Sequence, residues 1–388
     1  GSLNGLTVQT STNSADIIKL HADAGALQTI NILNDEGTSN SAIALTSNAG
    51  GITLSSKNLF YNTDTITVGS NGEITSLTAN GTVHNPIAST ILLNSVNGTF
   101  VETNILNANS SNRFGYSVAI SDTGNDSVSI IGSYLENAST GAAYIFDKSE
   151  GSWSNIIRLV SSDGASSDFF GRSVSISGTG NNAVAIIGAY GDDDNGSLSG
   201  SAYIFDKSVG SWAQIAKLTS SDGATDDYFG YSVAISDTGN DAVAIIGAYK
   251  DGSSAGSAYI FDKSSGSWAQ IAKLVASDGA VNDFFGYSVA ISGTGNNAVA
   301  IIGAYENNSS TGSAYIFDKS SGSWAQIAKL VATDGAASDT FGRSVAIFGT
   351  GNDAVAIIGA IGNDDSYSNS GSAYIFDKSS GSWAQIAK

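Results

Sequence analysis

The sequence predicts an all-β fold, a β-propeller of four-stranded antiparallel blades, and three observations support this prediction. One pattern of residues recurs five times and opens each time on a Phe-Gly pair, at Phe114, Phe170, Phe229, Phe285 and Phe341. Such self-similarity at a nearly fixed period of 56 to 59 residues is typical of repeat architectures. Each copy divides into four short runs rich in β-branched and aromatic residues, which are strand formers. The 388 residues include 46 glycines and one proline, which indicates many tight turns rather than long helices.

The third copy illustrates the four predicted strands, which are residues 231–235, 242–246, 258–261 and 268–274. The second run is almost continuously apolar, as expected of a strand that is covered on both faces. The first and third junctions are short and rich in Gly, Asn, Asp and Ser, so they predict hairpin turns. Four antiparallel strands in each repeat correspond to one propeller blade.

Residues 61–113 contain a degenerate copy of this pattern. Residues 90–100 match residues 258–268 in type at each position, and residues 65–68 and 74–77 supply two further strand-like runs. We therefore predict five clear blades over residues 114–388, preceded by a segment that is either a sixth, degenerate blade or a connector.

Residues 1–60 differ from the repeats, because they hold only short alternating runs separated by Gly, Asn, Ser and Asp. Such strands bury too little surface to be stable alone. They predict a β-rich, solenoid-like neck that is shared between identical chains, so we expect a homo-oligomer and favour a trimer. This stretch is similar to shaft and neck segments of phage and large-virus fibre proteins.

The repeats carry a second short element about 18 residues after each Phe-Gly pair. It reads Gly-Ala-Tyr at Gly188, Gly247 and Gly303, Gly-Ser-Tyr at Gly132 and Gly-Ala-Ile at Gly359. With the Phe-Gly openings, this pattern resembles the FG-GAP repeat family, which includes the blades of integrin α-subunits and many bacterial surface proteins. The proline of the family pattern is missing from every copy. The resemblance covers about 275 residues and implies the propeller fold, but propellers support many unrelated functions.

Composition excludes several classes of function. Sixteen basic and 35 acidic residues give a net charge of −19, which repels a phosphate backbone, so we expect no nucleic-acid partner. The absence of cysteine excludes disulfides, thiolate nucleophiles and Cys-bearing zinc sites. No apolar run is long enough to span a bilayer. The two histidines, His21 and His84, lie outside the five clear repeats, so no Ser-His-Asp arrangement can be built on them.

The resemblance implies a calcium loop at the first junction of each blade, but the residues fit it poorly. A hard cation needs several oxygen ligands, and the two copies that keep the leading aspartate offer only Asp122 and Asp126, and Asp237 and Asp241, as carboxylates. In the other three copies a glycine replaces the leading aspartate. We therefore predict hairpin turns here and no cofactor, with calcium the less favoured alternative. If the chain holds a divalent ion, the run Asp192, Asp193 and Asp194 is the preferred weak site.

Two features that recur in several blades are interpreted as structural. The fourth junction pairs two aspartates in four copies: Asp163 with Asp168, Asp222 with Asp227, Asp278 with Asp283 and Asp334 with Asp339. Such pairs could serve as acid and base, but their recurrence favours turn formation. A tryptophan at a fixed strand position, at Trp153, Trp212, Trp268, Trp324 and Trp383, predicts packing between blades.

The second junction breaks the symmetry, since its length and charge change while the flanking strands barely do. In an up-and-down blade it emerges at the same end as the fourth junction. This variable end predicts a recognition surface, although exposed loops also drift when nothing constrains them. Its candidate binding residues are Glu136, Asn137, Asp192, Asp193, Asp194, Asp251, Glu306, Asn307, Asp364 and Asp365.

Three functions remain in competition. The first is a non-enzymatic surface or virion structural protein, a fibre or spike head that attaches to a host surface glycan or receptor protein. The second is a glycan-degrading enzyme of the tailspike type, and the third is a purely architectural decoration that contacts neighbouring capsid or surface proteins. We favour the first, with an extracellular or virion-surface location and no insertion into a membrane.

Overall fold

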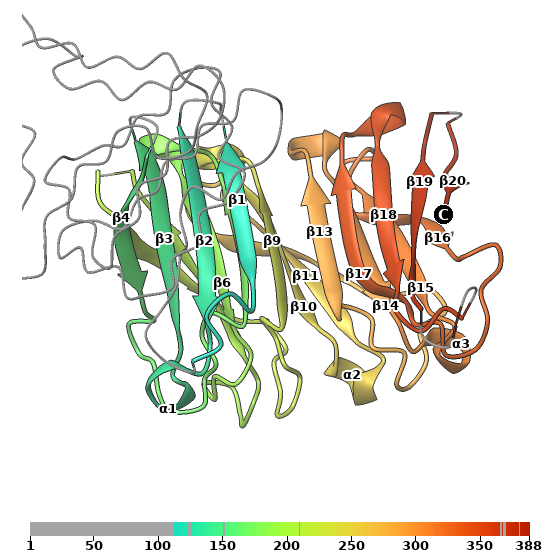
Figure 1. The fold of residues 1–388 in the computed structure, drawn as a ribbon, viewed down its shortest axis with the longest axis horizontal. Coiled ribbons are helices and arrows are strands. Elements are labelled where there is room, and N and C mark those ends of the chain that lie inside the picture. The colour runs from blue at the N-terminus through green and yellow to red at the C-terminus, as the bar shows by residue number, and fades with distance from the viewer. Residues whose placement is uncertain are drawn as a thin grey trace, which may run out of the picture. The chain divides into compact units, whose positions relative to one another are not determined.

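A computed structural model describes residues 112–122, 126–149, 152–208, 210–364, 367, 370–379 and 381–388, which all belong to one compact unit. They form five sheets, each of four antiparallel strands paired in chain order, and we call these sheets blades 1 to 5 (Figure 1). Blade 1 contains β1 (Val118–Asp122), β2 (Ser127–Ser133), β3 (Ala142–Ser149) and β4 (Ser152–Leu159). Blade 2 contains β5 (Ser173–Ser177), β6 (Val184–Ala189), β7 (Ser201–Asp206) and β8 (Ala213–Leu218).

Blade 3 contains β9 (Ser232–Ser236), β10 (Val243–Ala248), β11 (Ser257–Asp262) and β12 (Ala269–Leu274). Blade 4 contains β13 (Ser288–Ser292), β14 (Val299–Ala304), β15 (Ser313–Asp318) and β16 (Ala325–Leu330). Blade 5 contains β17 (Phe341–Phe348), β18 (Val355–Ala360), β19 (Ser372–Asp377) and β20 (Ala384–Ala387). The prediction of five clear, four-stranded propeller blades is confirmed, with strand bounds within about two residues of those expected in blade 3. The neck at residues 1–60 and most of the segment 61–113 lie outside the described residues.

Each hydrophobic core lies between two blades rather than within one. Alternate residues of a strand point to opposite faces of its sheet, so β10 contributes to two cores. Ala244 and Ile246 pack with residues of blade 2, whereas Val243 and Ile245 pack with residues of blade 4. All six residues of β10 are buried as a result. This confirms the prediction that the second strand is covered on both faces.

Consecutive blades also meet through their backbones at the Phe-Gly pair. Phe285 is fully buried, and its N–H donates to the carbonyl oxygen of Ala255 at 3.0 Å. A Cβ on Gly247 would lie 2.0 Å from the carbonyl oxygen of Gly286, so only glycine permits this approach. We call this arrangement the Phe-Gly contact. It recurs between the other described blades as the pairs Gly132–Gly171, Gly188–Gly230 and Gly303–Gly342.

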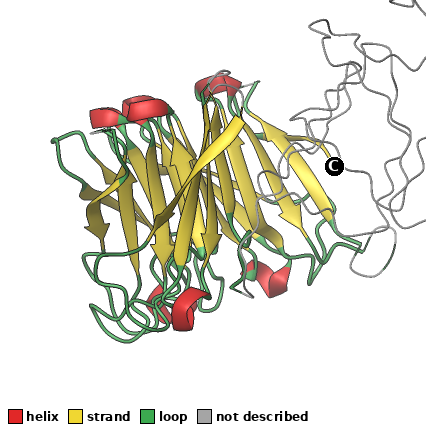
Figure 2. Cartoon of the chain, turned by 60° about the vertical axis from the view of Figure 1, so that its left-hand side comes forward, coloured by secondary structure: helices red, strands yellow, loops and turns green. Residues whose placement is uncertain are grey.

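The two ends of the strands carry different short elements. The second junctions of three blades contain four-residue helices, α1 (Glu136–Ser139), α2 (Asp251–Ser254) and α3 (Asn307–Ser310), which lie at the lower end in Figure 1. The first junctions of blades 2 to 5 contain 3-10 turns at the opposite end (Figure 2), named η1 (Gly180–Asn182), η2 (Gly239–Asp241), η3 (Gly295–Asn297) and η4 (Gly351–Asp353). We call the end with the second and fourth junctions the loop face. No helix in the described part of the chain is long and apolar enough to cross a membrane.

Candidate functional site

The loop face is built by the second junction of one blade packing against the fourth junction that leads into the next. The N–H of Phe284, at the end of a fourth junction, donates to the carbonyl oxygen of Ser254 in the preceding second junction at 3.0 Å. The N–H of Phe169 donates in the same way to Ser139 at 2.8 Å. The two junctions therefore emerge together, as predicted, and form one continuous surface.

Each second junction is fixed by one polar side chain, which we call the anchor residue. The anchor residues are Glu136, Asp192, Asp251, Asn307 and Asn363. Each contacts the tyrosine of the third strand of its own blade, the basic residue of the fourth strand, or both. Glu136, for example, accepts hydrogen bonds from the hydroxyl of Tyr144 at 2.7 Å and from Nε of Arg158 at 2.6 Å. Second junctions that differ in sequence are therefore attached to their blades in the same way.

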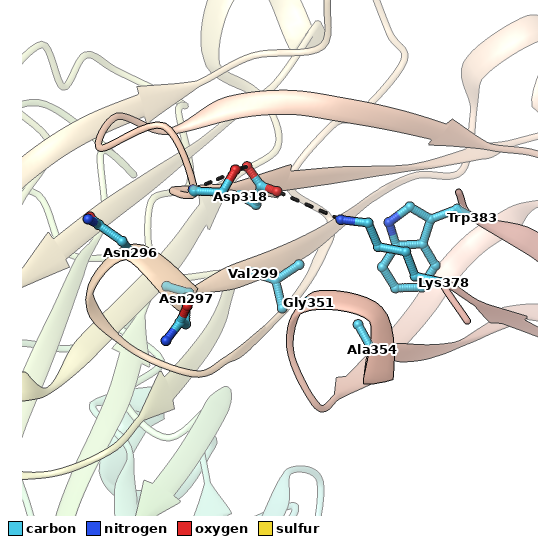
Figure 3. Close-up of a pocket in the computed structure, with 10 residues that line it drawn as sticks. Asn296, Asn297, Val299, Asp318, Gly351, Ala354, Lys378 and Trp383 are labelled. Atoms are coloured by element: carbon cyan, nitrogen blue, oxygen red, sulfur yellow. Dashed lines mark hydrogen bonds and ion pairs between the residues drawn. The ribbon is translucent and has the colours of Figure 1, made fainter. Parts of the chain in front are cut away.

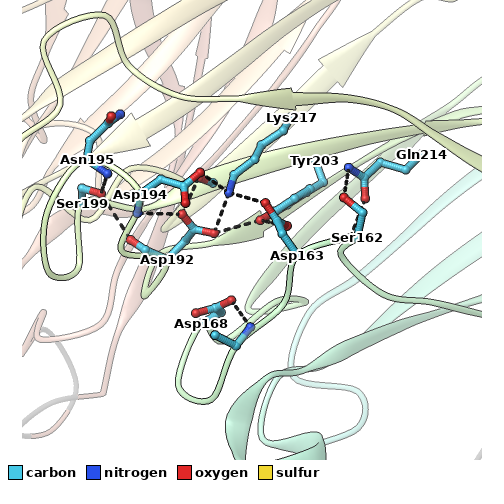
Figure 4. Close-up of polar contacts among 12 residues, drawn as sticks. Ser162, Asp163, Asp168, Asp192, Asp194, Asn195, Ser199, Tyr203, Gln214 and Lys217 are labelled. Atoms are coloured by element: carbon cyan, nitrogen blue, oxygen red, sulfur yellow. Dashed lines mark hydrogen bonds and ion pairs between the residues drawn. The ribbon is translucent and has the colours of Figure 1, made fainter.

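Blade 2 has the most elaborate of these attachments (Figure 4). Lys217 Nζ lies 2.7 Å from a carboxylate oxygen of Asp163, 3.0 Å from Asp192 and 2.5 Å from Asp194. The hydroxyl of Tyr203 lies 2.8 Å from Asp192 and 2.9 Å from Asp163. The second strand pair of the blade, β7 and β8, therefore holds both the second junction and the preceding fourth junction in place.

Electrostatics fix the protonation states of this network. Burial raises the pKa of Tyr203, and the charge of Asp192 raises it further, so the phenol stays neutral and acts as a donor. Burial alone would raise the pKa of Asp163, but hydrogen bonds from Lys217 and Tyr203 outweigh it and lower this pKa. Burial would lower the pKa of Lys217, yet the surrounding carboxylates raise it overall. At neutral pH Lys217 is therefore a protonated amine and Asp163 an ionised carboxylate.

The predicted weak metal site falls within this network, with one change of membership. Asp192 and Asp194 lie together, and their third partner is Asp163, with one oxygen of each within 4.8 Å of the others. Asp193 instead accepts a hydrogen bond from the N–H of Leu198 at 2.7 Å. Because Lys217 Nζ already bonds all three grouped carboxylates, its ammonium supplies part of the positive charge that a divalent ion would bring and competes with such an ion for the same oxygens.

The other residues predicted for the variable surface divide into exposed tips and buried attachments. Four have exposed side chains: Asn137, Asp193, Asp194 and Asp364. The anchor residues Asp192 and Asn307 are buried, and Glu136 and Asp251 are half-buried. Glu306 is half-buried and accepts a hydrogen bond from Ser310. Asp365 lies outside the described residues.

The first-junction aspartates lie at the end opposite the loop face and stabilise turns. Asp122 accepts a hydrogen bond from Ser127 Oγ at 2.8 Å, and Asp237 accepts one from the N–H of Thr238 at 2.8 Å. Asp126 and Asp241 are exposed. Within the described ranges, none of these four aspartates joins a group of three metal-ligating side chains. These contacts agree with the predicted hairpin turns.

The second aspartate of each fourth junction closes its own turn. Asp168 is buried, and its carboxylate accepts a hydrogen bond from the N–H of Ala165 at 2.7 Å. Asp283 does the same with Ala280 at 2.8 Å and also accepts one from the amide of the anchor Asn307 at 2.8 Å. Burial raises the pKa of Asp168 and also that of the equivalent Asp227. The interpretation as a turn cap is supported by each of these contacts.

Sequence reasoning missed an aromatic cluster on the loop face. Ten rings, which we call the aromatic belt, follow one another across blades 1 to 4 with neighbouring centroids 4.5 to 6.2 Å apart: Tyr116, Tyr134, Phe169, Tyr190, Tyr228, Tyr231, Tyr249, Phe284, Tyr287 and Tyr305. Arg172 lies 4.3 Å above the rings of Tyr116 and Tyr231. The sequence does contain a signal for this cluster. Aromatic residues flank the Phe-Gly pairs and end the Gly-Ala-Tyr or Gly-Ser-Tyr element in successive copies.

The repeated tryptophans lie at the other end of the blade interfaces. Trp383, Lys378 and Asp318 line a cavity of about 130 Å³ between blades 4 and 5 (Figure 3). The predicted inter-blade packing is confirmed, since Trp383 contacts the core that blades 4 and 5 share. The ring is half-buried because it lies just before the outermost strand, β20, although its Nε1 is enclosed without a hydrogen-bond partner.

Comparison with solved structures finds similar folds at low identity. The chain is similar to the hydrazine synthase of Kuenenia stuttgartiensis, with 13% identity, TM-score 0.44, and coverage of 76% of this chain and 70% of the other. A functionally unknown protein from Desulfotomaculum acetoxidans DSM 771 shares 12% identity, with TM-score 0.43 and coverage of 71% and 70%. A fucose-specific lectin from Aleuria aurantia shares 12% identity, with TM-score 0.40 and coverage of 70% and 78%. No curated protein matches the sequence.

The sequence matches a family model, that of the FG-GAP repeat, over residues 153–205, 212–261, 268–317 and 324–376. Each matched unit begins at the tryptophan of one blade and ends at the phenylalanine of the third strand in the next blade. It therefore includes the Phe-Gly contact and the core that the two blades share. Because the matches cover more than half of the chain and coincide with the five blades, this protein belongs to the FG-GAP repeat family.

Proposed function

We propose that this protein is a non-enzymatic attachment protein, the head of a fibre or spike on a virion or cell surface, which binds its target through the loop face. One observation carries the proposal, namely the division of each second junction into a constant anchor and a variable tip. Asp192 and Asn307 occupy equivalent buried positions in their blades, and each contacts the lysine at the equivalent position of the fourth strand of its own blade. The tips beyond them differ in sequence and are exposed. A rigid scaffold that presents different loops is typical of recognition proteins.

The chemistry of the tips favours a glycan as the target. Asn137, Asp193 and Asn308 are exposed and offer amide and carboxylate groups that suit the hydroxyls of a sugar. The net charge of −19 disfavours a strongly acidic polysaccharide. A neutral glycan on a host surface therefore fits these loops best.

The state of the carboxylates supports a binding role rather than hydrolysis. A glycosidase needs one carboxyl held as an acid and another as a free nucleophile or base. Asp163 is bonded to Lys217 and Tyr203, and Asp278 is bonded to Lys329 and Tyr315 at 2.5 and 2.9 Å. Their partners at Asp168 and Asp283 accept backbone hydrogen bonds within the same turns.

Binding of the full chain to a glycan array and to host cells tests the proposal. We expect Asp193→Ala with Asn308→Ala, which alters two tips and no anchor, to weaken binding at least about tenfold, as expected from losing two polar contacts. The matched control is Asp241→Ala with Asn296→Ala, which alters two exposed residues at the opposite end.

Three outcomes separate the alternatives. Binding that survives removal of glycans from the cells would identify a receptor protein as the target. Turnover of the bound glycan would establish the enzymatic function. A chain that binds neither glycans nor cells would contradict an attachment role and leave the architectural one.

A further inference from the structure

Three basic side chains beside the aromatic belt have no acidic partner. Arg172 lies between two of the rings, and the ammonium of Lys250 lies 4.1 Å from the ring centroid of Tyr228. The guanidinium of Arg343 lies 5.2 Å from the ring centroid of Tyr287. Within the described part of the chain none of these three cations forms an ion pair, whereas the basic residue near the end of each fourth strand is paired with a carboxylate. The belt therefore holds positive charges that the carboxylates of the described ranges do not contact, in a chain with 35 acidic residues.

The tyrosine hydroxyls divide in the same way. On the third strand of each blade the tyrosine hydroxyl donates to a carboxylate, as Tyr315 does to Asp278 at 2.9 Å. No belt hydroxyl donates to a carboxylate of the described residues. Burial raises the pKa of Tyr231 and of Tyr249, so these phenols stay protonated and act as donors. The belt is thus rich in hydrogen-bond donors and poor in acceptors.

Four of these donors form a row, which we call the donor row: Arg172, Tyr231, Tyr287 and Arg343. Each directly follows the Phe-Gly pair of its blade, in blades 2 to 5, and each is half-buried at the loop-face end of a first strand. An Nη of Arg172 donates to the hydroxyl of Tyr231 at 2.7 Å, and that hydroxyl donates to the hydroxyl of Tyr287 at 3.3 Å. The proton of the Tyr287 hydroxyl then has no acceptor among the described residues, and Arg343 lies beside it. An external acceptor would complete the row.

A carboxylate matches this row best. Its two oxygens can accept from a guanidinium and a phenol together, and hydrogen bonds to a charged partner are the stronger kind. The net charge of −19 disfavours a ligand with many negative charges but allows a single one. The belt also leads directly into the variable tips, since the tip residue Asn308 comes three residues after the belt residue Tyr305.

We propose that the donor row binds the carboxylate of one acidic sugar, in a glycan whose other units are neutral and reach the variable tips. This inference rests on the proposed function and adds to it the chemical class of one unit of the target. The tips supply contacts to hydroxyls, and the donor row selects the charged unit.

A glycan array tests the inference when each acidic glycan stands beside the same glycan with its carboxyl group reduced to a primary alcohol. The wild-type chain binds an acidic member at least about tenfold more tightly than its reduced form. Arg172→Met with Arg343→Met removes this preference. Tyr287→Phe keeps the ring and removes only the hydroxyl, so it weakens binding of the acidic form about threefold to tenfold and leaves the reduced form unaffected.

The matched control is Lys148→Met with Lys263→Met. These two lysines also lack an ion pair among the described residues, but they lie at third junctions, at the end opposite the loop face. The control removes the same net charge as the double arginine variant, so it separates the donor row from the overall charge of the chain. It keeps the preference for the acidic glycan.

The outcomes distinguish this inference from the proposed function. Binding that depends on the tip residues Asp193 and Asn308 but is equal for acidic and reduced glycans overturns the inference alone. A preference for the acidic form that persists in the double arginine variant and in Tyr287→Phe also overturns it. A short Glu-rich peptide that displaces the acidic glycan at a similar concentration would assign the donor row to an acidic protein instead. A chain that binds no glycan, acidic ones included, contradicts both.

Discussion

Single side chains decide what the loop face can hold, and Lys217 is the clearest case. Three carboxylates converge on blade 2, an arrangement that would attract a divalent cation if it were unbalanced. The ammonium group of Lys217 contacts all three and offsets part of their negative charge. The run Asp192, Asp193 and Asp194 predicts a cluster of carboxylates here, and the structure groups two of these residues with Asp163. The compensating positive charge comes from a lysine 23 residues beyond Asp194, which only the fold brings into contact.

The first prediction concerns the exchange of this lysine for a metal ion. We expect the wild-type chain to bind calcium weakly at most, because the ion would have to displace the ammonium of Lys217. Lys217→Met removes the charge and keeps much of the side-chain volume, so it should produce a calcium site of measurable affinity. Calorimetric titration checks this, and Lys217→Met with Asp194→Ala should lose the new site. Equal calcium affinity in the wild type and in Lys217→Met would contradict this account.

A second prediction concerns the glycine of the Phe-Gly contact. Gly247→Ala would place a Cβ 2.0 Å from the carbonyl oxygen of Gly286, so the two blades would have to separate. We expect a loss of about 1–3 kcal/mol in the free energy of unfolding, as for other overpacked sites. Urea denaturation followed by circular dichroism measures it.

The control for that substitution is the equivalent glycine of blade 5. A Cβ on Gly359 would meet only the movable hydroxyl of Ser344, at 2.4 Å, and no backbone of a neighbouring blade. Gly359→Ala should therefore cost clearly less than Gly247→Ala in dilute solution. A similar loss in both variants would show that the inter-blade approach does not set the requirement for glycine.

At the scale of elements, strands were more predictable than junctions. The apolar run at residues 242–246 predicts a doubly covered strand, and β10 spans Val243–Ala248 with every residue buried. Periodicity and the bounding turn residues were sufficient there, because each strand repeats five times. The helices α1, α2 and α3 were not predicted. They are tight turns in which three of the four residues have positive φ, and they have no apolar pattern of their own.

The division of the second junction into anchor and tip could not be predicted either. Asp192 and Asp193 are adjacent and chemically identical, yet the first is buried and the second exposed. Burial of the first follows from its contacts with Tyr203 and Lys217, which lie on β7 and β8. The aromatic belt was not predicted from the sequence for a related reason. Its rings come from three separate positions in each repeat, and neighbouring rings often belong to different blades.

The third prediction concerns the acid sensitivity of the fourth junctions. Partial burial raises the pKa of Asp278, but hydrogen bonds from Lys329 and Tyr315 outweigh it, so this pKa is lowered overall, as it is at the equivalent Asp163, Asp222 and Asp334. A lowered pKa stabilises the fold above the ordinary value of about 3.9, and this contribution is lost as pH falls through the lowered value. We therefore expect thermal stability to fall in acid below about pH 4. The raised pKa of Asp168 acts in the opposite sense and offsets part of the loss.

Substitution of the four aspartates by asparagine tests this pH dependence. The variant should be less stable than the wild type at neutral pH, and the difference should shrink as pH falls below about 4. Each pair is partly exposed, so each should contribute no more than about 1 kcal/mol. The control is Asp241→Asn with Asp353→Asn, at two exposed turns on the opposite end. A stability difference that is constant across this range of pH would exclude a contribution from these ionisations.

For the whole molecule, the sharing of cores between blades determines how stability is distributed. The four cores of the described region each combine residues from two consecutive blades. Such an array is approximately a sum of nearest-neighbour interfaces. The two terminal blades differ from the others because each contributes to one of these cores rather than two.

The fourth prediction compares one residue in two blades. Ile245→Ala, in a fully buried position between blades 3 and 4, should lower the free energy of unfolding by about 2–5 kcal/mol through lost burial and a residual cavity. Ile357→Ala makes the same change at the exposed equivalent in blade 5 and should cost under about 1 kcal/mol in dilute solution. Denaturation at low protein concentration measures both. Equal losses would mean that this face of blade 5 is covered even in the isolated chain.

The shared cores also constrain how the protein is made. A repeat that has just left the ribosome has only one half of the core that it shares with the following repeat, so the apolar side chains on that face stay exposed until the following repeat has been synthesised. One repeat is 56 residues long between Phe229 and Phe285. At about 5–20 residues per second, each blade therefore waits several seconds for its neighbour, with Val and Ile side chains open to other chains. The low content of charged residues, 13%, offers little protection during that interval. Production of this protein should accordingly be more sensitive to the rate of translation and to chaperone supply than the stability of the finished array would suggest.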